Sequence, residues 1–203
     1  MHAETLISDL MDYSSLGEVD NQYRLDIISF MQKFPDSWWQ RSTPEGHVTA
    51  SAWILNREKT HVLFLHHRKL NKWLQPGGHL DETDFSPANG ALREAIEETG
   101  INKLTLTNPQ KPALFDVDIH RIPARGAEPA HFHYDVRYLL NLPDESGESG
   151  ETDEKMCARI AISNESLGFR WFSIAEVVRE HEPSLARMAK KTLLSLNMHE
   201  PKI

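Results

Sequence analysis

Segment 86–100 constrains the fold of this chain more than any other part of it. Ser86 and Pro87 offer an N-cap followed by a proline in the first helical turn, and Gly100 stands where a C-terminal cap belongs. Between these signals, apolar residues recur at helical spacing: Ala88, Ala91, Leu92, Ala95 and Ile96. The sequence therefore predicts a helix with both ends defined and one face packed in a core.

The other side of this predicted helix is acidic. Glu94, Glu97 and Glu98 are three or four residues apart, so their carboxylates share a face, and each like-charged pair disfavours a helix by roughly 0.2–0.5 kcal/mol. The last two also stand at the negative end of the helix dipole. Arg93 can pair with Glu97 but cannot neutralise all three carboxylates. The face is either an ordinary solvated one or a site for a hard divalent cation, which prefers oxygen ligands.

The segment before this helix, residues 75–81, reads Gln-Pro-Gly-Gly-His-Leu-Asp and predicts a tight glycine turn that brings backbone groups near the carboxylates. Together the turn and the helix resemble the Nudix box. The matching positions are Gly78, Asp84, Arg93, Glu94, Glu97, Glu98, Gly100 and Ile101. Asp84 stands where the family has its first glutamate, one residue further from Arg93 than in the family pattern. Glu82 is the alternative for that role.

The resemblance implies an α/β fold, the Nudix α/β/α sandwich around a mixed sheet. It implies a hydrolase that cleaves the diphosphate linkage of a small molecule, usually a nucleoside diphosphate joined to another group, with Mg²⁺ or Mn²⁺ as cofactor. By similarity, Glu94 and Glu98 are the expected metal ligands, with the backbone carbonyl of Gly78 beside them. Glu97 would be a third ligand or orient the attacking water. Arg93 would hold the carboxylates through charge-assisted hydrogen bonds.

Four residues outside this core of the motif are further candidates. Glu165, just before a predicted strand, is a candidate general base, although a structural or solvent role fits it as well. Arg121 and Arg125 are candidates for binding substrate phosphate, because a guanidinium offers two hydrogen bonds to one anion. His79, inside the glycine turn, is a further candidate substrate contact.

Alternating polar residues mark one predicted strand. His131, His133 and Asp135 are two residues apart, so they share one face of that strand. Two histidines and an aspartate could bind zinc. The simpler interpretation is a row of hydrogen-bonded polar residues that lines a cleft wall.

The rest of the chain divides at about residue 45. Residues 1–45 predict a helical extension with two apolar stripes, in which Asp20 is a plausible N-cap, Pro35 ends the second helix and Trp38 with Trp39 anchors the packing. Residues 46–203 predict the Nudix domain. Its expected strands are 47–55, 61–67, 113–119, 131–140 and 169–172, and its later helices begin at a capping box at Ser173 and near residue 185.

Composition excludes several classes of function. The formal net charge is −8, so an acidic chain would repel the phosphates of duplex nucleic acid. No run approaches the roughly 18 apolar residues of a membrane span, and the first residues lack the pattern of a signal peptide. The single cysteine, Cys157, excludes an intramolecular disulfide and is expected to be an incidental surface thiol. A cytoplasmic protein is expected, with a flexible acidic loop at 142–154.

Two other functions compete with hydrolysis. A Nudix-fold module could bind a nucleotide-like ligand and regulate without turnover, although the intact helix glutamates favour catalysis. A Nudix-fold isomerase of isoprenoid diphosphates is disfavoured, because it usually needs a cysteine before the box and Cys157 lies far beyond it. A homodimer is common among relatives and is a possible state here.

Overall fold

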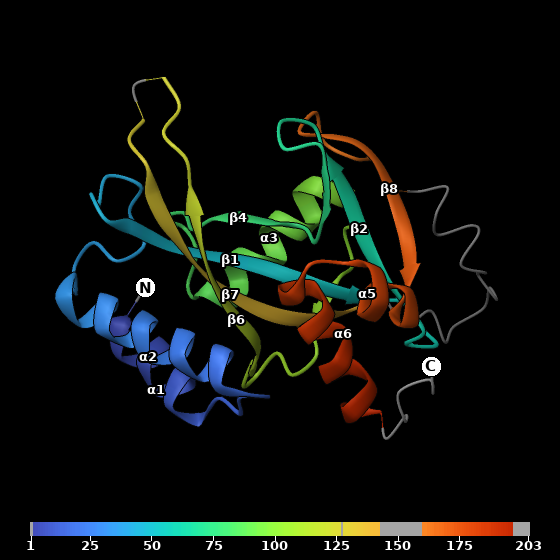
Figure 1. The fold of residues 1–203 in the computed structure, drawn as a ribbon, viewed down its shortest axis with the longest axis horizontal. Helices are drawn as coiled ribbons and strands as arrows, with labels where there is room; N and C mark the ends of the chain where they lie inside the picture. Colours follow the sequence, from blue (N-terminus) through green and yellow to red (C-terminus); the bar gives the residue numbers. More distant parts are fainter. Residues whose placement is uncertain (1, 127, 143–159, 197–203) are drawn as a thin grey trace.

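The structure, a computed structural model, describes residues 2–126, 128–142 and 160–196 (Figure 1). Cys157 and nearly all of the predicted acidic loop lie outside these residues. The described helices are α1 (Ala3–Asp12), α2 (Glu18–Lys33), α3 (Pro87–Thr99), α5 (Ile174–Glu180) and α6 (Pro183–Ser195). The described strands are β1 (Gly46–Leu55), β2 (His61–His67), β3 (Lys72–Leu74), β4 (Gly77–His79), β5 (Thr105–Leu106), β6 (Leu114–Ile122), β7 (His131–Asn141) and β8 (Ser166–Ser173). Within this part of the chain, no helix is both long and apolar enough to cross a lipid bilayer.

The sheet is mixed, as expected, and β1 is its central strand. β1 pairs in parallel with β7 along its whole length and antiparallel with β4 and with the start of β2. β6 and β5 pair antiparallel with β7, and β8 and β3 pair antiparallel with β2. The β6–β7 hairpin therefore projects from one side of β1, and the β2–β3–β8 group lies on the other side (Figure 1).

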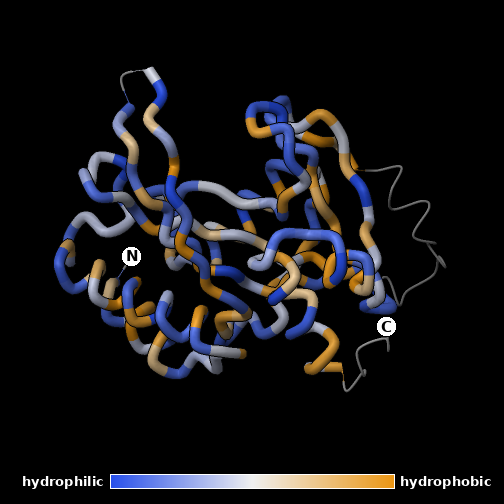
Figure 2. The backbone as a smooth tube through the Cα atoms, in the orientation of Figure 1, coloured by the Kyte–Doolittle hydropathy of each residue, from blue (hydrophilic) through white to orange (hydrophobic). Residues whose placement is uncertain are grey.

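Helices cover both faces of the sheet, which confirms the predicted α/β/α sandwich. Alternate residues of β1, such as Val48 and Ala50, join α1, α2 and α3 in one buried apolar cluster. Trp53 and Leu55 join α5 and α6 in a second cluster on the opposite face. Hydrophobic and hydrophilic stretches alternate along α1 and α2 in Figure 2, as expected of helices with one buried side.

The N-terminal helices pack against the sheet rather than away from it. Leu6, Leu10 and Ile27 are almost fully buried in the same cluster as β1 and α3. Phe30 of α2 stacks on Tyr134 of β7, with ring centroids 4.0 Å apart. The continuity of this core shows that the helices cover one face of the sheet, and the division of the chain at residue 45 stays a prediction.

Two local predictions in this region had different outcomes. Trp38 is buried at 1% exposure, as expected of a packing anchor. Asp20 is not the N-cap of α2: the helix begins at Glu18 after Gly17, and the Asp20 carboxylate accepts hydrogen bonds from the backbone N–H groups of Leu16 (2.8 Å) and Gly17 (2.9 Å). The carboxylate therefore caps the same helix from its third position.

The predicted glycine turn at 75–81 is a strand in part. Gly77–His79 forms β4, which pairs with β1 in the register Thr49↔His79, Ala50↔Gly78 and Ser51↔Gly77. Glycine pairs have low strand propensity, so only the tertiary pairing with β1 makes this segment extended. The sequence analysis also missed the short strands β3 and β5, which are likewise held by pairing with long neighbours.

Candidate active site

Gly78 and Glu94 are in close contact where β4 passes over α3. A Cβ atom on Gly78 would lie 2.7 Å from the carboxylate carbon of Glu94 and 2.8 Å from both its oxygens. Only glycine allows this approach without displacing the carboxylate. The contact places the backbone of Gly78 beside a carboxylate that is only 18% exposed.

Glu98, one helical turn further on, is held by the neighbouring glycine. Its carboxylate accepts a hydrogen bond of 3.0 Å from the backbone N–H of Gly77. Burial, together with the negative charges of Glu94 and Glu165, raises the pKa of Glu98 to about 7, although the hydrogen bond from Gly77 acts in the opposite direction. Burial also raises the pKa of Glu94. Both carboxylates are therefore costly to ionise without a nearby cation.

The guanidinium of Arg93 lies within this cluster and donates hydrogen bonds to several acceptors. It donates two hydrogen bonds of 3.0 Å to the carboxylate of Asp84, one of 2.9 Å to Glu94 and one of 3.3 Å to Glu97. It also donates to the backbone carbonyl of His79 at 2.9 Å. The hydrogen bonds to Asp84 are the main cause that raises the pKa of Arg93. Among the described hydrogen bonds and ion pairs of Arg93, none reaches Glu98.

Two acidic residues were candidates for the first acidic position of the motif. Asp84 is the one that contacts Arg93, whereas Glu82 is exposed. The Asp84 side chain is only 4% exposed and also accepts the backbone N–H of Asp81 at 2.8 Å. Between Asp84 and Arg93, Ser86 caps α3 by accepting the N–H of Asn89.

The other candidate residues lie outside this cluster, on two separate segments of the chain. Glu165 is exposed on the segment that passes the C-terminal end of α3, and its charge acts on both Glu98 and His79. Arg121 and Arg125 are exposed on the projecting β6–β7 hairpin. Among the described residues, no hydrogen bond or ion pair joins either arginine to the carboxylates of α3, whereas the charge of Glu165 acts on Glu98.

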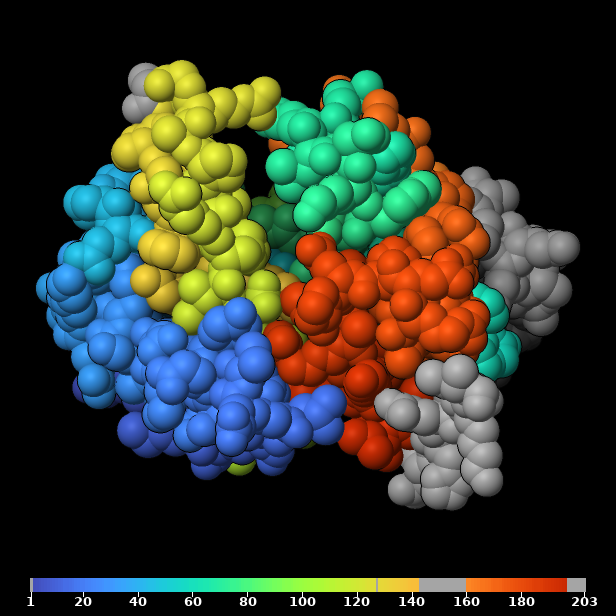
Figure 3. Space-filling view, viewed as in Figure 1, coloured from blue at the N-terminus to red at the C-terminus, as the bar shows by residue number. Residues whose placement is uncertain are grey.

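A cleft opens above the sheet next to this cluster. Figure 3 shows a hollow between the yellow atoms of the β6–β7 hairpin, the teal atoms around β2 and β3 and the red atoms of α5 and α6. β4 lies between these walls in Figure 1. The odd-numbered residues of β1 before Trp53 and their neighbours on β7 are polar, and they face the same side as α6.

The hydrogen bonds on this face show which residues of the alternating His131–Asp135 pattern could still bind a ligand. Asp135 is 1% exposed, and its carboxylate accepts hydrogen bonds from Thr49 (3.0 Å), Ser51 (2.8 Å) and Arg137 (2.8 Å). It is therefore a hydrogen-bonded residue of the cleft floor, as in the simpler interpretation of the pattern. The histidines lie together, and burial lowers the pKa of His133 to about 2.

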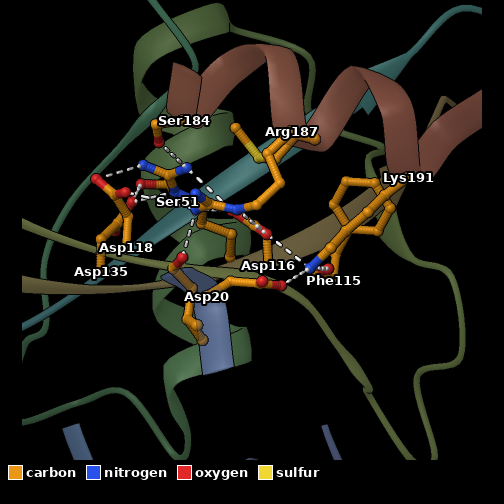
Figure 4. A network of polar contacts seen from close by, with 12 residues as sticks. Asp20, Ser51, Phe115, Asp116, Asp118, Asp135, Ser184, Arg187 and Lys191 are labelled. Carbon is orange, nitrogen blue, oxygen red and sulfur yellow. Dashed lines mark hydrogen bonds and ion pairs between the residues drawn. The ribbon is translucent and has the colours of Figure 1, made fainter. Parts of the chain in front are cut away.

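A buried ionic network next to the cleft was missed by the sequence analysis (Figure 4). Asp116 on β6 contacts Arg137 (3.2 Å), Arg187 (2.8 Å) and Lys191 (2.7 Å), which come from β7 and α6. Burial alone would raise the pKa of Asp118, but Arg137 holds it well below its usual range. Charged residues two apart in a strand flanked by apolar residues were the available signal.

This network fixes α6 and the N-terminal helices to the edge of the cleft. Lys191 of α6 contacts Asp20 of α2 at 3.0 Å, and Arg137 donates to Ser184 at the start of α6 (Figure 4). The cleft walls are thus connected to the sheet by charge-assisted hydrogen bonds.

Comparison with known proteins identifies the family. The family model of the NUDIX domain matches residues 45–192. The chain belongs to the Nudix family. A curated Nudix relative, the probable DHNTP pyrophosphohydrolase of Lactococcus lactis subsp. cremoris (strain MG1363), is 30% identical over 151 residues, which cover 73% of this chain and 84% of the relative.

Solved Nudix structures share the fold. The C. elegans Ap4A hydrolase, solved as a binary complex, matches with a TM-score of 0.52 and 17% identity over 74% of this chain and 97% of that one. The E. coli dihydroneopterin triphosphate pyrophosphohydrolase matches with a TM-score of 0.52 and 19% identity over 72% and 95%. This Nudix chain is thus a hydrolase by family, with the Nudix box in β4, α3 and the loop between them.

The residues of the box fit the divalent cation that Nudix hydrolases generally use. Glu94 and Glu98 offer the carboxylate oxygens that Mg²⁺ and Mn²⁺ prefer, and the backbone of Gly78 lies against Glu94. Burial raises the pKa of both carboxylates, so a cation bound between them would stabilise their ionised forms.

Proposed function

We propose that this Nudix protein is a metal-dependent hydrolase of the diphosphate linkage in a nucleoside diphosphate-type substrate. The supporting observation is the pair Glu94 and Glu98, two partly buried carboxylates positioned against Gly78 and Gly77. A solvated acidic face, the alternative considered from the sequence, would leave these carboxylates free in water. Instead, the fold holds them where ionisation is costly, which is explained if they bind Mg²⁺ or Mn²⁺.

The bound ion would offset the charge of the diphosphate and lower the pKa of the attacking water. The chain's own residues supply position and proton transfer. Glu94, Glu98 and the Gly78 carbonyl hold the ion, and Arg93 keeps Glu94 and Glu97 in place through its shared hydrogen bonds. Glu97, with a side chain 57% exposed, is proposed as a third ligand or as the residue that orients the attacking water.

Glu165 is proposed as the general base. Its support is electrostatic proximity, since its charge acts on Glu98 and on His79 across the opening of the cleft. The segment that carries it is fixed to the end of α3, because the N–H of Ser163 donates to the carbonyl of Glu98 at 3.2 Å. A base on this segment would therefore keep a constant position relative to the metal ligands.

The substrate's remaining charge is proposed to be bound by the β6–β7 hairpin and by His79. Arg125 stands beside the hairpin tip, where its backbone pairs with Glu128. Replacing Arg125 with Ala should raise KM more than it lowers kcat, because a contact of equal strength in the ground and transition states contributes only to binding. Steady-state kinetics on the substrate measure this, and unchanged KM and kcat would remove the hairpin from the site.

A substrate screen tests the proposed function. Purified protein with Mg²⁺ is incubated with nucleoside diphosphate derivatives, nucleoside triphosphates and DHNTP, the compound in the name of the L. lactis relative. Released phosphate is measured after adding a phosphatase. We expect hydrolysis of at least one phosphoanhydride that requires the metal. Binding of these compounds without turnover would contradict the proposal and favour a regulatory module.

The cytoplasmic location and homodimeric state expected from the sequence stay predictions. Size-exclusion chromatography with light scattering measures the second directly, against the 23.3 kDa mass of one chain.

A further inference from the structure

Three histidines from three strands meet beside the Nudix box. His47 of β1, His79 of β4 and His133 of β7 each offer a ring nitrogen, and these nitrogens all lie within 4.8 Å of one another. The pairing of the strands causes this meeting: His47 stands opposite His133 in the parallel pair, and His79 stands opposite Thr49, two residues along β1. The ring centroid of His47 lies 4.9 Å from that of His79 and 4.8 Å from that of His133.

His47 is the member of this cluster that needs an explanation. Its residue is 1% exposed, and neither of its ring nitrogens has a hydrogen-bond partner. A buried polar group without a partner costs about 1–3 kcal/mol. The ring lies among the other imidazoles, so its unpartnered nitrogens are within reach of a shared ligand.

His131 lies beside this cluster and offers a fourth nitrogen next to His133. Its Nδ1 lies 3.0 Å from the carbonyl of Pro129, which fixes the proton on that nitrogen and leaves Nε2 as a lone-pair donor. This Nε2 lies 3.3 Å from Nε2 of His133. Two nitrogens of a tetrahedral zinc site are roughly 3.4 Å apart, because Zn–N distances are about 2.0–2.1 Å. A metal-bound histidine usually donates its other ring N–H to a carbonyl or carboxylate, as His131 does to the carbonyl of Pro129.

We propose that His47, His79, His133 and His131 bind one transition-metal cation of the Zn²⁺ class, at a site distinct from the glutamates of α3. Neutral imidazoles select Zn²⁺ and its first-row neighbours, whereas Mg²⁺ prefers oxygen. The ring nitrogens of His47, His79 and His133 lie within 4.8 Å of one another, and Nε2 of His131 lies 3.3 Å from Nε2 of His133. The proposal rests on the histidines alone and does not depend on the proposed hydrolase activity.

The ion would link β1, β4 and β7 through the last residue of the short strand β4. β4 has three residues and is paired with β1 alone among the described strands. His79 follows Gly78 directly, so a metal bond to its ring would fix the strand that approaches Glu94. The carboxylates of Glu128 and Glu165 act on His79 electrostatically and would balance part of the added charge.

Metal titration of the untagged full-length protein tests this site. The protein is stripped with a chelator, dialysed and titrated with Co²⁺ in excess Mg²⁺, which occupies oxygen sites. We expect one equivalent of Co²⁺ to give the visible spectrum of a tetrahedral, nitrogen-rich complex, and one equivalent of Zn²⁺ to displace it. A featureless titration, or an octahedral oxygen-type spectrum, would overturn the proposal.

Three variants assign the site. His133→Gln should weaken Co²⁺ binding by more than about tenfold, whereas the matched control His61→Gln, at the far end of the same sheet, should bind as the parent does. Glu98→Gln should also keep the tetrahedral spectrum. Loss of the spectrum in Glu98→Gln but not in His133→Gln would place the ion on the carboxylates and refute the site. X-ray absorption of the zinc-loaded parent, which needs no variant, must show nitrogen ligands at the zinc distance, and an oxygen shell would refute it.

Discussion

Replacing Glu98 with Gln should stabilise the metal-free protein while abolishing its activity. Glutamine keeps the shape of the side chain, and its carbonyl oxygen can still accept the hydrogen bond from the N–H of Gly77. What the substitution removes is a charge that burial and the neighbouring carboxylates of Glu94 and Glu165 disfavour. Without metal, ionisation of the buried Glu98 carboxylate therefore lowers the folding stability of the parent but not that of the variant.

The size of this cost depends on pH. The pKa of Glu98 is raised from 4.5 to about 7 in the folded protein, so folding favours the protonated form. The stability that this group contributes is complete below pH 4.5 and is lost as the pH rises through about 7. One pKa unit corresponds to about 1.4 kcal/mol, and discounting for partial solvent screening leaves about 1–3 kcal/mol at pH 8. For a domain of this size, that is about 2–10 °C in Tm.

Thermal melting in a chelating buffer at pH 5 and pH 8 measures the effect. We expect Glu98→Gln to melt above the parent at pH 8 and the difference to shrink at pH 5. Adding Mg²⁺ should reverse the order, since an ion at 100 times its Kd stabilises the parent by about 2.7 kcal/mol. Glu97→Gln is the matched control: it removes the same charge from the same helix face, but its side chain is 57% exposed, so its Tm should stay close to the parent's. An equal gain in both variants, or a gain for Glu98→Gln that is the same at pH 5 and pH 8, would refute the reasoning.

Three further changes test the surrounding structure. Gly78→Ala should lower activity on the order of 10²-fold with little change in Tm, because its Cβ would displace the Glu94 carboxylate; kinetics that match the parent would contradict this. Arg93→Ala should destabilise the fold by about 3 kcal/mol in urea unfolding, because it leaves the buried Asp84 carboxylate without its cation, and a change below about 1 kcal/mol would be inconsistent with that ion pair. Deleting residues 1–40 should leave an insoluble chain or one with a much lower Tm, because it exposes one face of the core; a soluble chain with the parent's Tm would show that the helices are dispensable.

The sequence was most informative where local signals and tertiary structure agree. The ends of α3 were predicted from Ser86 and Gly100, and the structure confirms both: Ser86 accepts the N–H of Asn89, and Gly100 has a left-handed φ of 71°. The long strands β1, β2 and β7 were likewise predicted close to their true bounds, since they are rich in the β-branched, aromatic and aliphatic residues that are enriched in strands.

Features created by pairing across the fold were not predictable in this way. β4 has the sequence Gly-Gly-His, which reads as a turn, and it becomes a strand only because β1 lies beside it. The histidine cluster joins His47, His79 and His133, which are far apart in the chain, whereas the sequence pattern could suggest only neighbours on one strand. Asp20 was predicted as the N-cap of its helix from its residue type, which was wrong, and only the packing of α6 shows why its carboxylate is buried beside Lys191.

Hydrolysis by Glu98→Gln decides whether Glu98 binds the cation that the reaction requires. The rate on the substrate found by the screen is measured against Mg²⁺ concentration for the parent and for the variant. We expect metal-dependent turnover for the parent and a loss of more than about 10²-fold for the variant, although the variant folds at least as stably without metal. A variant that hydrolyses the substrate at the parent rate with the same Mg²⁺ dependence would show that the metal lies elsewhere.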